Sequence, residues 1–221
     1  MKMPGSAESG WAVFLVLVLV SAMCAQAQQV RKVPAVTRGG APEAPSSGAP
    51  VGKIQKVIGT GRDALVPTPE YHAAAGAAVK RPGTWVEIKT VFDTAPEWVD
   101  EIVFNYYVMT MQRDKGNAVS VFTGTVRHAN VAQGRDHFSA MYLMPKMLSR
   151  YGSVVAVAVE MSIGGAVVDL KTEQMRKLPA NWWKSPEVMQ SAKIAVKTDA
   201  LLPREKTPFA FVNWDDYEGA Q

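Results

Sequence analysis

Apolar and polar residues alternate through the middle of the chain. In residues 84–92 (TWVEIKTVF), Val86, Ile88 and Phe92 share one side, and the residues between them face the other. This period of two is typical of a half-buried β-strand. Residues 98–111 continue the pattern, and the Asp-Thr-Ala-Pro sequence at 93–96 has turn chemistry, so we expect the two strands to form an antiparallel hairpin.

The same reasoning predicts further strands on both sides of this pair. They cover residues 53–58, 118–126, 137–143, 153–161, 166–170 and a closing strand at 207–214. Short helices are expected at 68–79 and 185–195, where Pro and Glu follow a capping hydroxyl, and one helical turn fits 145–152. No long helical period separates the strands, which argues against a parallel sheet. The pattern therefore predicts a mainly β fold, an antiparallel β-sandwich with one or two short helices.

Residues 154–159 (VVAVAV) are apolar on both faces of the expected strand. Such a strand is either central in its sheet and covered on both sides, or an edge that another chain covers. We favour the central position. Strand addition by a partner would follow from the edge position.

The first 27 residues have the pattern of a secretory signal. Lys2 precedes an apolar run at 11–20, and Ala25-Gln26-Ala27 fits a cleavage site after Ala27. The run is too short to span a bilayer comfortably. An uncleaved anchor and a lipoprotein site at Cys24 are the less favoured alternatives. Leu15 stands where a prepilin carries Glu, which argues against a polymerising pilin subunit.

We expect residues 28–52 to form a flexible tether and residues 53–221 to form a single β-sandwich domain. Four Pro and four Gly fall within residues 33–52, and valine is the largest aliphatic residue there. Such a stretch buries too little apolar area to offset its ordering entropy. It either holds the domain away from a membrane or assembly, or it is a plain tail.

Composition and charge exclude several classes of protein. The chain has 221 residues with 48% hydrophobic and 20% charged residues, which fits one globular domain rather than a disordered chain. The single Cys excludes a disulfide scaffold. The formal net charge of +4 comes from scattered Lys and Arg, so no nucleic-acid partner is expected.

The histidines do not predict a catalytic or metal centre. His72, His128 and His137 are the only imidazoles, and no G-x-S-x-G motif accompanies them. His128, Asp136 and His137 could be imagined as three metal ligands, but their spacing is not that of a zinc site. We interpret them as polar loop residues in water, and expect no enzyme activity, no catalytic residue, no metal and no cofactor.

Four aromatic residues are the candidate ligand or partner surface: Trp182, Trp183, Trp214 and Tyr217. They have polar neighbours, as in sugar-binding platforms. More often such tryptophans cap the open end of a sandwich core, and this is the interpretation we favour. A glycan-binding adhesive module on the cell surface is kept as the alternative function.

The order of features resembles a known family. A signal and a Pro-rich tether precede GTWVEIKTVFDTAPEWVDEIVFNYYVM, and the chain ends in KTPFAFVNWDDYE. Over residues 53–218 it resembles verrucomicrobial secreted proteins that are type IV pilus-like, are encoded among pilus assembly genes and have an immunoglobulin-like β-sandwich. The Cys…Trp…Cys framework of antibody domains is absent, so the likeness to immunoglobulins concerns architecture alone.

The resemblance implies a non-enzymatic assembly component with pilus-like or envelope proteins as partners. It also implies an exported location in the periplasm, outer membrane or cell surface. Membrane association is expected only through partners or an uncleaved signal.

Overall fold

The computed structural model describes residues 51–70, 82–95, 97–198, 200–213 and 216–219. The predicted signal with its cleavage site at Ala27, and all but the last two residues of the tether, lie outside the described residues. So does nearly all of the helix expected at 68–79, and the part of it that is described, residues 68–70, is not helical.

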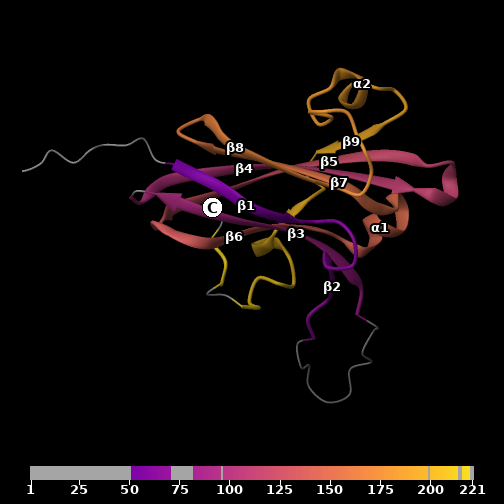
Figure 1. The fold of residues 1–221 in the computed structure, drawn as a ribbon. Coiled ribbons are helices and arrows are strands. Elements are labelled where there is room, and N and C mark those ends of the chain that lie inside the picture. The colour runs from indigo at the N-terminus through magenta and orange to yellow at the C-terminus, as the bar shows by residue number, and fades with distance from the viewer. Residues whose placement is uncertain (1–50, 71–81, 96, 199, 214–215, 220–221) are drawn as a thin grey trace, which may run out of the picture. The chain divides into compact units, whose positions relative to one another are not determined.

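Two five-stranded sheets pack face to face (Figure 1). Sheet A contains β1 (Val51–Ile58), β2 (Leu65–Pro67), β3 (Thr84–Ala95), β6 (Gly134–Leu143) and β10 (Leu202–Pro203). Sheet B contains β4 (Val99–Gln112), β5 (Ala118–Val131), β7 (Ser153–Ile163), β8 (Ala166–Gln174) and β9 (Ala195–Thr198). Every pairing is antiparallel except the short parallel contact of β5 with β9. The mainly β sandwich with two short α-helices is confirmed.

Alternation along the long strands builds the main core between the sheets. Ile88 and Phe92 point inward from β3, and Ile102 and Phe104 point inward from β4, all fully buried. The rings of Phe92 and Phe104 meet across the two sheets with centroids 4.9 Å apart. Burying each such side chain contributes about 1.5 to 3 kcal/mol, so this layer is the main source of stability.

Strand β7 is central, as its apolar faces predicted. It lies between β4 and β8, with Val157 and Val159 in the main core and Ala156 and Ala158 in a second apolar cluster on the outer face of sheet B. The hairpin of β7 with β8 across the glycine pair is also confirmed.

The expected hairpin of residues 84–92 with 98–111 is wrong. These strands are β3 and β4, which lie in different sheets. Both edges of β3 are already occupied, one by β1 and β2 and the other by β6, so β4 has no edge to join. Residues 93–95, expected in the turn, are the end of β3 and pair with β1.

Helix α1 (Pro145–Tyr151) covers one open end of the sandwich, where one helical turn was predicted. Its Tyr151 ring contacts Phe122 edge-on at 5.3 Å. The helix ends at Gly152, whose φ of +82° suits glycine. A Cβ there would also collide with the backbone oxygen of Met111, so the turn into β7 requires glycine.

The residues that follow β8 cover the outer faces of both sheets. The segment around α2 (Pro186–Met189) lies over sheet B, and the 3₁₀ turn η2 (Arg204–Lys206) with the turns that follow lies under sheet A (Figure 1). Helix α2 is one turn long rather than the expected two. Because the segment around α2 covers the outer face of sheet B, this sheet has apolar residues on both of its faces.

The closing strand predicted at 207–214 is wrong for the residues described there. Thr207, Ala210 and Val212 instead donate backbone hydrogen bonds three residues back, which makes consecutive turns. The Thr207 hydroxyl donates to the Arg204 carbonyl at 2.7 Å and accepts from the amide of Phe209 at 3.2 Å. Such local bonding by a threonine competes with strand pairing and overrides the aromatic composition.

Candidate functional site

Trp182 and Trp183 lie on the outer face of sheet B, and they are not an exposed platform. Their side chains are 1% and 4% exposed, and their rings meet edge-on at 5.8 Å. They pack on Met109 and Val121 of β4 and β5 and on the alanines of β7. The preference for a core role is therefore right. Their position is not, because they cover a sheet face rather than an open end.

Trp183 also satisfies a buried carboxylate. Its indole N–H donates to Glu160 Oε1 at 2.9 Å, and Lys184 Nζ lies 2.5 Å from the same oxygen. Glu160 is 3% exposed and needs both partners, because a buried charge without them is costly. The hydrogen bond to Glu160 raises the pKa of Lys184. Burial, assisted by the Glu160 charge, raises the pKa of Tyr107.

A small hollow of about 240 Å³ lies beside the tryptophans. Leu170, Thr172 and Gln174 of β8 form one wall, and residues 178–183 form the other. The indole N–H of Trp182 is buried and has no hydrogen-bond partner among the described residues. A buried donor of this kind normally has a partner, so this one is a feature to explain.

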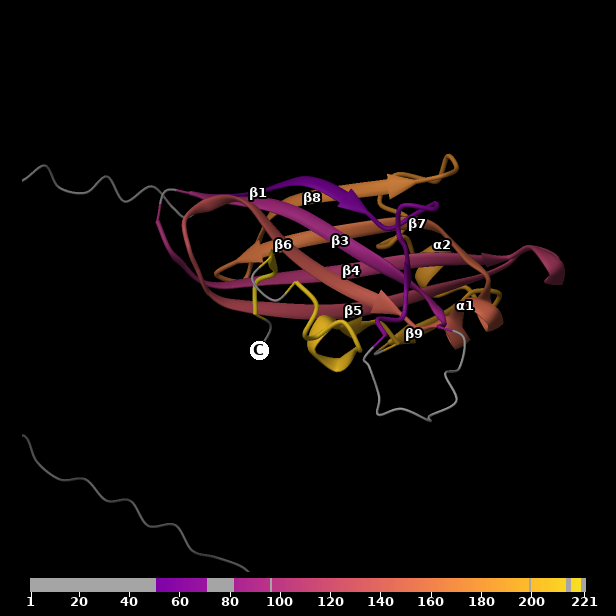
Figure 2. The same cartoon turned by 90° about the horizontal axis from the view of Figure 1, so that it is seen from below.

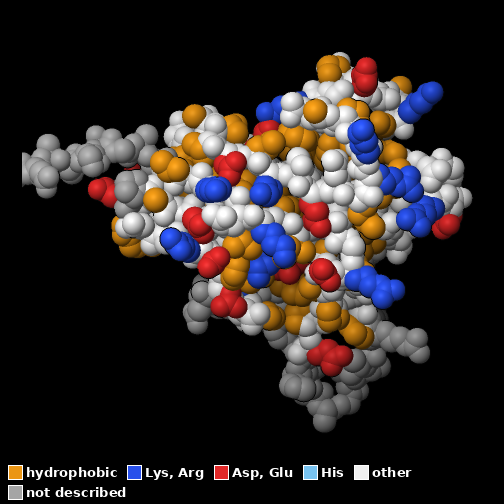
Figure 3. All heavy atoms as spheres, in the orientation of Figure 1, with side chains coloured by type: hydrophobic (Ala, Val, Ile, Leu, Met, Phe, Trp, Pro, Cys, Tyr) orange, Lys and Arg blue, Asp and Glu red, His pale blue; other side chains and the backbone are white. Residues whose placement is uncertain are grey.

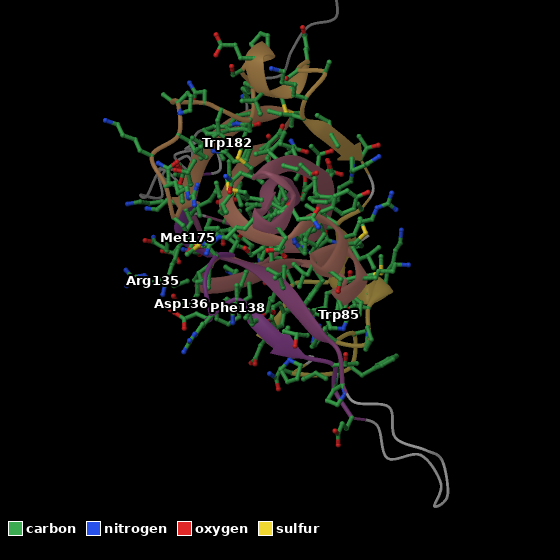
Figure 4. All side chains as sticks on the ribbon, turned by 90° about the vertical axis from the view of Figure 1, so that its right-hand side faces the viewer. Trp85, Arg135, Asp136, Phe138, Met175 and Trp182 are labelled. Atoms are coloured by element: carbon green, nitrogen blue, oxygen red, sulfur yellow. The ribbon has the colours of Figure 1, made fainter. Side chains whose placement is uncertain are left out.

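Tyr217 lies on the opposite side of the two sheets. It shares Glu87 with Tyr142, and both phenols donate to Glu87 Oε1 at 2.7 Å. Burial raises the pKa of each phenol well above its ordinary value, and the Glu87 carboxylate adds to both shifts. In Figure 4, Trp182 lies above the sheets and Trp85 and Phe138, on the outer face of sheet A, lie below them. Trp214 lies outside the described residues, and the three described members of the predicted surface do not form one site.

The two described histidines are not loop residues in water, which corrects our expectation. His128 is 2% exposed inside the sandwich, and His137 is half-buried on β6. Asp136 is exposed beside His137, where its amide donates to Asp93. No group of three metal-binding side chains occurs among the residues that the structure describes. His72 lies outside them.

A chain of hydrogen bonds crosses the core at His128. Tyr106 donates to Ser139 Oγ at 2.9 Å, and Ser139 Oγ lies 2.8 Å from His128 Nε2. His128 Nδ1 lies 3.1 Å from the carbonyl oxygen of Gly219, which can only accept, so Nδ1 carries the proton. Burial lowers the pKa of His128 and raises that of Tyr106 to about 12. All three groups are thus neutral and satisfied.

This chain places a serine hydroxyl next to an imidazole base, as in nucleophilic catalysis. Ser139 and His128 are 1% and 2% exposed, so a substrate would reach the hydroxyl only by parting the two sheets. The imidazole is also oriented by a backbone carbonyl and not by a carboxylate. Tyr106, Ser139 and His128 therefore form a structural polar network, in which each side chain orients the next.

His137 and Glu218 hold the end of the described chain in place. His137 Nδ1 lies 2.6 Å from Glu218 Oε1, and the amide of Glu218 donates to the carbonyl of Phe138 at 3.0 Å. Residues 216–219 therefore lie along the gap between β5 and β6. We call this feature the tail edge: strands β5 and β6 with residues 216–219 between them.

At the opposite edge of the sandwich, β8 is bonded to β1 by carboxylates. Asp169 accepts from the amide of Ile54 at 2.7 Å, and Glu173 accepts from the amides of Gly59 and Thr60 at 2.6 and 3.2 Å and from the Thr60 hydroxyl at 2.7 Å. Figure 2 shows β1 and β8 along the same edge. We call this the carboxylate edge: strands β1 and β8 joined through Asp169 and Glu173. These bonds block strand addition to β1.

Among the described strands, β8 pairs with β7 alone, and it exposes apolar side chains. Val167, Val168 and Leu170 are 53%, 40% and 37% exposed, and Met175 just after the strand is 58% exposed. These four residues are the β8 patch, and they are half of the large hydrophobic side chains most exposed in the described chain. Hydrophobic side chains gather over the β7–β8 hairpin at the upper left of Figure 3.

The sequence analysis missed this patch and the two carboxylates. The alternation of Val168 and Leu170 with Asp169 and Lys171 was a usable signal for a strand with one charged face. The expected strand stopped at residue 170, so Glu173 lay beyond its end. The charged face of β8 contacts the β1 segment, which lies more than 100 residues earlier in the sequence. Only the topology of the fold determines this contact.

Comparison with known proteins agrees with this architecture. The fold is a mainly antiparallel β-sandwich, and the chain belongs to a protein family whose model matches residues 56–221. The description of this family states no activity. A crystal structure of a protein from Akkermansia muciniphila, a verrucomicrobe, is similar with a TM-score of 0.65 and 19% identity, over 78% of this chain and 93% of that chain. At this identity the similarity concerns the fold.

The other comparisons add less. A search among curated protein sequences found no match. Within the described residues, no helix has both the length and the apolar character that crossing a bilayer requires.

Proposed function

We propose that the chain is an exported, non-enzymatic protein-interaction component of a type IV pilus-like envelope assembly. The β8 patch is the observation that carries this proposal. Large apolar side chains concentrated on one edge strand are typical of a protein-binding surface, and an edge strand can also accept a partner strand. The resemblance of the sequence to pilus-like secreted proteins supports the choice of partner class.

Two further features support an interaction role rather than catalysis. The one serine–imidazole pair found in the described chain is sealed inside the core. The side of β8 that faces away from β7 is bonded to the β1 segment through Asp169 and Glu173, so a partner would meet the exposed apolar side chains of β8 rather than a bare strand edge. A predicted signal and tether would place the domain outside the inner membrane, at some distance from its point of attachment.

Photocrosslinking in intact native cells tests the partner. A photoreactive amino acid at Val168 or Leu170 should crosslink to pilus-like assembly proteins, whereas the same group at the exposed Arg135 of β6 should not. Crosslinks only to cytoplasmic enzymes, or equal yields from all three positions, would refute the assignment. Sequencing the N-terminus of the processed protein tests export, with Gln28 expected as the first residue.

A matched pair of variants tests the surface. Val168→Glu and Val51→Glu both place a charge on an exposed valine of an edge strand. Both should change the free energy of unfolding by no more than about 0.5 kcal/mol. Only Val168→Glu should abolish the crosslink from Leu170. Loss with both variants would show that the effect is not specific to β8.

The glycan-binding alternative is favoured by one observation, the unpartnered indole N–H of Trp182 beside the polar hollow. Because both tryptophan rings are buried, a sugar could not stack on them and would bind through hydrogen bonds alone. Trp182→Phe removes the N–H and keeps the ring. Glycan-array binding that is lost in Trp182→Phe and retained in the matched Thr125→Val variant, remote from the hollow, would support this alternative.

A further inference from the structure

A larger cavity lies at the α1 end of the sandwich. Its volume is about 460 Å³, within the range of ligand sites. The turn after β1, the starts of β3 and β7, helix α1 and the residues after β8 contribute to it.

The interior of this cavity is apolar and continuous with the main core. Val86 and Val154 belong to the core cluster between the sheets, and Leu148 of α1 packs against that cluster. Leu65 and Met175, at 45% and 58% exposed, extend the apolar lining to the surface. A ligand that entered here would therefore contact hydrocarbon along most of its length.

The charged groups of the lining are all positive. Three arginines, Arg62, Arg113 and Arg176, line the cavity, and no acidic side chain of the described residues does. All three are exposed, and none has an ion-pair partner in the described part of the chain. The nearby carboxylate of Glu173 is occupied by the amides of Gly59 and Thr60. Guanidinium groups bind carboxylates in a bidentate manner, so the rim suits an anionic head group.

From this combination we infer that the cavity binds a single-chain anionic amphiphile, a fatty acid with its carboxylate at the arginines and its acyl chain in the apolar interior. The volume sets the size of the ligand. A cavity of about 150 Å³ holds benzene, with six non-hydrogen atoms, so one of this size holds about 18. Hexadecanoate has that number. A peptide segment fits less well, because its backbone amides would find few polar partners in this lining.

Calorimetric titration of the purified, delipidated protein with hexadecanoate below its aggregation concentration tests the site. One equivalent should bind, and hexadecanol, which has the same chain without the charge, should bind about tenfold or more weakly. Hexadecyltrimethylammonium should bind no better than the alcohol. Equal affinity for the three compounds, or binding only above the aggregation concentration, would overturn the inference.

Variants locate the head group. Arg62→Gln, Arg113→Gln and Arg176→Gln should each weaken hexadecanoate binding several-fold, and the triple variant should weaken it by about 100-fold while hexadecanol binding is unchanged. Met175→Glu places a negative charge at the exposed lining and should also weaken carboxylate binding selectively. Arg127→Gln on β5, remote from the cavity, is the matched control. Undiminished binding by a folded triple variant would overturn the assignment.

Discussion

The carboxylate edge and the tail edge join the same two sheets in different ways. At the carboxylate edge, side chains of β8 accept from a backbone amide of β1 and from the amides of Gly59 and Thr60 just after it, at 2.6 to 3.2 Å. At the tail edge, the gap between β5 and β6 is occupied by residues 216–219, held by two imidazoles, one backbone hydrogen bond and the bond of Tyr217 to Glu87. One edge is thus closed by the strands themselves, and the other depends on residues 216–219, which belong to no strand.

The two edges should differ in how readily they open and in whether pH affects them. At the carboxylate edge, Asp169 and Glu173 can bond to the β1 segment once β1 and β8 lie side by side. The tail edge is complete only when residues 216–219 have docked, and its bonds involve a titratable group whose pKa is lowered by burial, His128. We expect the tail edge to open first when the protein is destabilised, because residues 216–219 belong to no strand and are held mainly by individual hydrogen bonds.

Removing residues 217–221 should have the largest effect. The truncation deletes the Tyr217 bond to Glu87, both bonds of Glu218 and the carbonyl that orients His128. With about 1 kcal/mol for each bond and more for charged partners, the free energy of unfolding should fall by about 3 to 5 kcal/mol. Urea denaturation measures the loss. A loss below about 1 kcal/mol would mean that the tail is only loosely attached.

Glu173→Ala should have the next largest effect, and it tests the carboxylate edge. The change leaves the amides of Gly59 and Thr60 and the Thr60 hydroxyl without their acceptor, for a loss of about 2 to 3 kcal/mol. Glu101→Ala is the control, because its ion pair with Arg127 at 3.3 Å is exposed and should contribute less than about 1 kcal/mol. Equal losses in the two variants would remove the distinction between an edge bond and a surface ion pair.

Asp169→Ala should be milder, with a loss of about 1 to 2 kcal/mol, because only the Ile54 amide loses a long-range acceptor. Asp169→Asn keeps an oxygen acceptor and should recover most of that loss. Hydrogen exchange at the Ile54 amide provides a local measurement, and its protection should fall in the alanine variant. Unchanged protection in both variants would indicate that the bond does not form in solution.

Much of the fold could be predicted from local patterns. The period of two located the six strands from Thr84 to the β7–β8 hairpin, and the apolar run at 154–159 identified a central strand. Sheet membership could not be predicted in the same way. Residues 93–96 have the composition of a hairpin turn whether the chain returns to the same sheet or crosses to the other, and only the occupied edges of β3 decide the matter.

The candidate sites were less predictable for the same reason. Trp182 and Trp183 stand out for their chemistry, but whether they are covered depends on the face of sheet B that residues 175–194 pack against. His128 was expected in a loop because the predicted strand ended at residue 126. In the structure β5 continues to Val131, and the alternation then places His128 inside the core. Extending a strand by two residues changed a solvated residue into a buried one.

The smallest predicted effect is a pH dependence of the tail edge. Burial lowers the pKa of His128 from an ordinary value of 6.5, so the unfolded chain takes up a proton at a higher pH than the folded protein does. The contribution of neutral His128 is fully present above about pH 6.5 and is lost as the pH falls toward the lowered pKa. The free energy of unfolding should therefore fall as the pH is lowered from 7 to 5.

Comparison with His128→Gln isolates this contribution. The variant lacks the titrating ring, while His137 remains in both proteins and its contribution cancels in the difference. The wild-type protein should be more stable than the variant at pH 7, and its advantage in urea denaturation should be smaller at pH 5. If the advantage were the same at both pH values, burial would not be what keeps His128 neutral. The tail edge would then respond to pH no more than any other hydrogen-bonded contact in the sandwich.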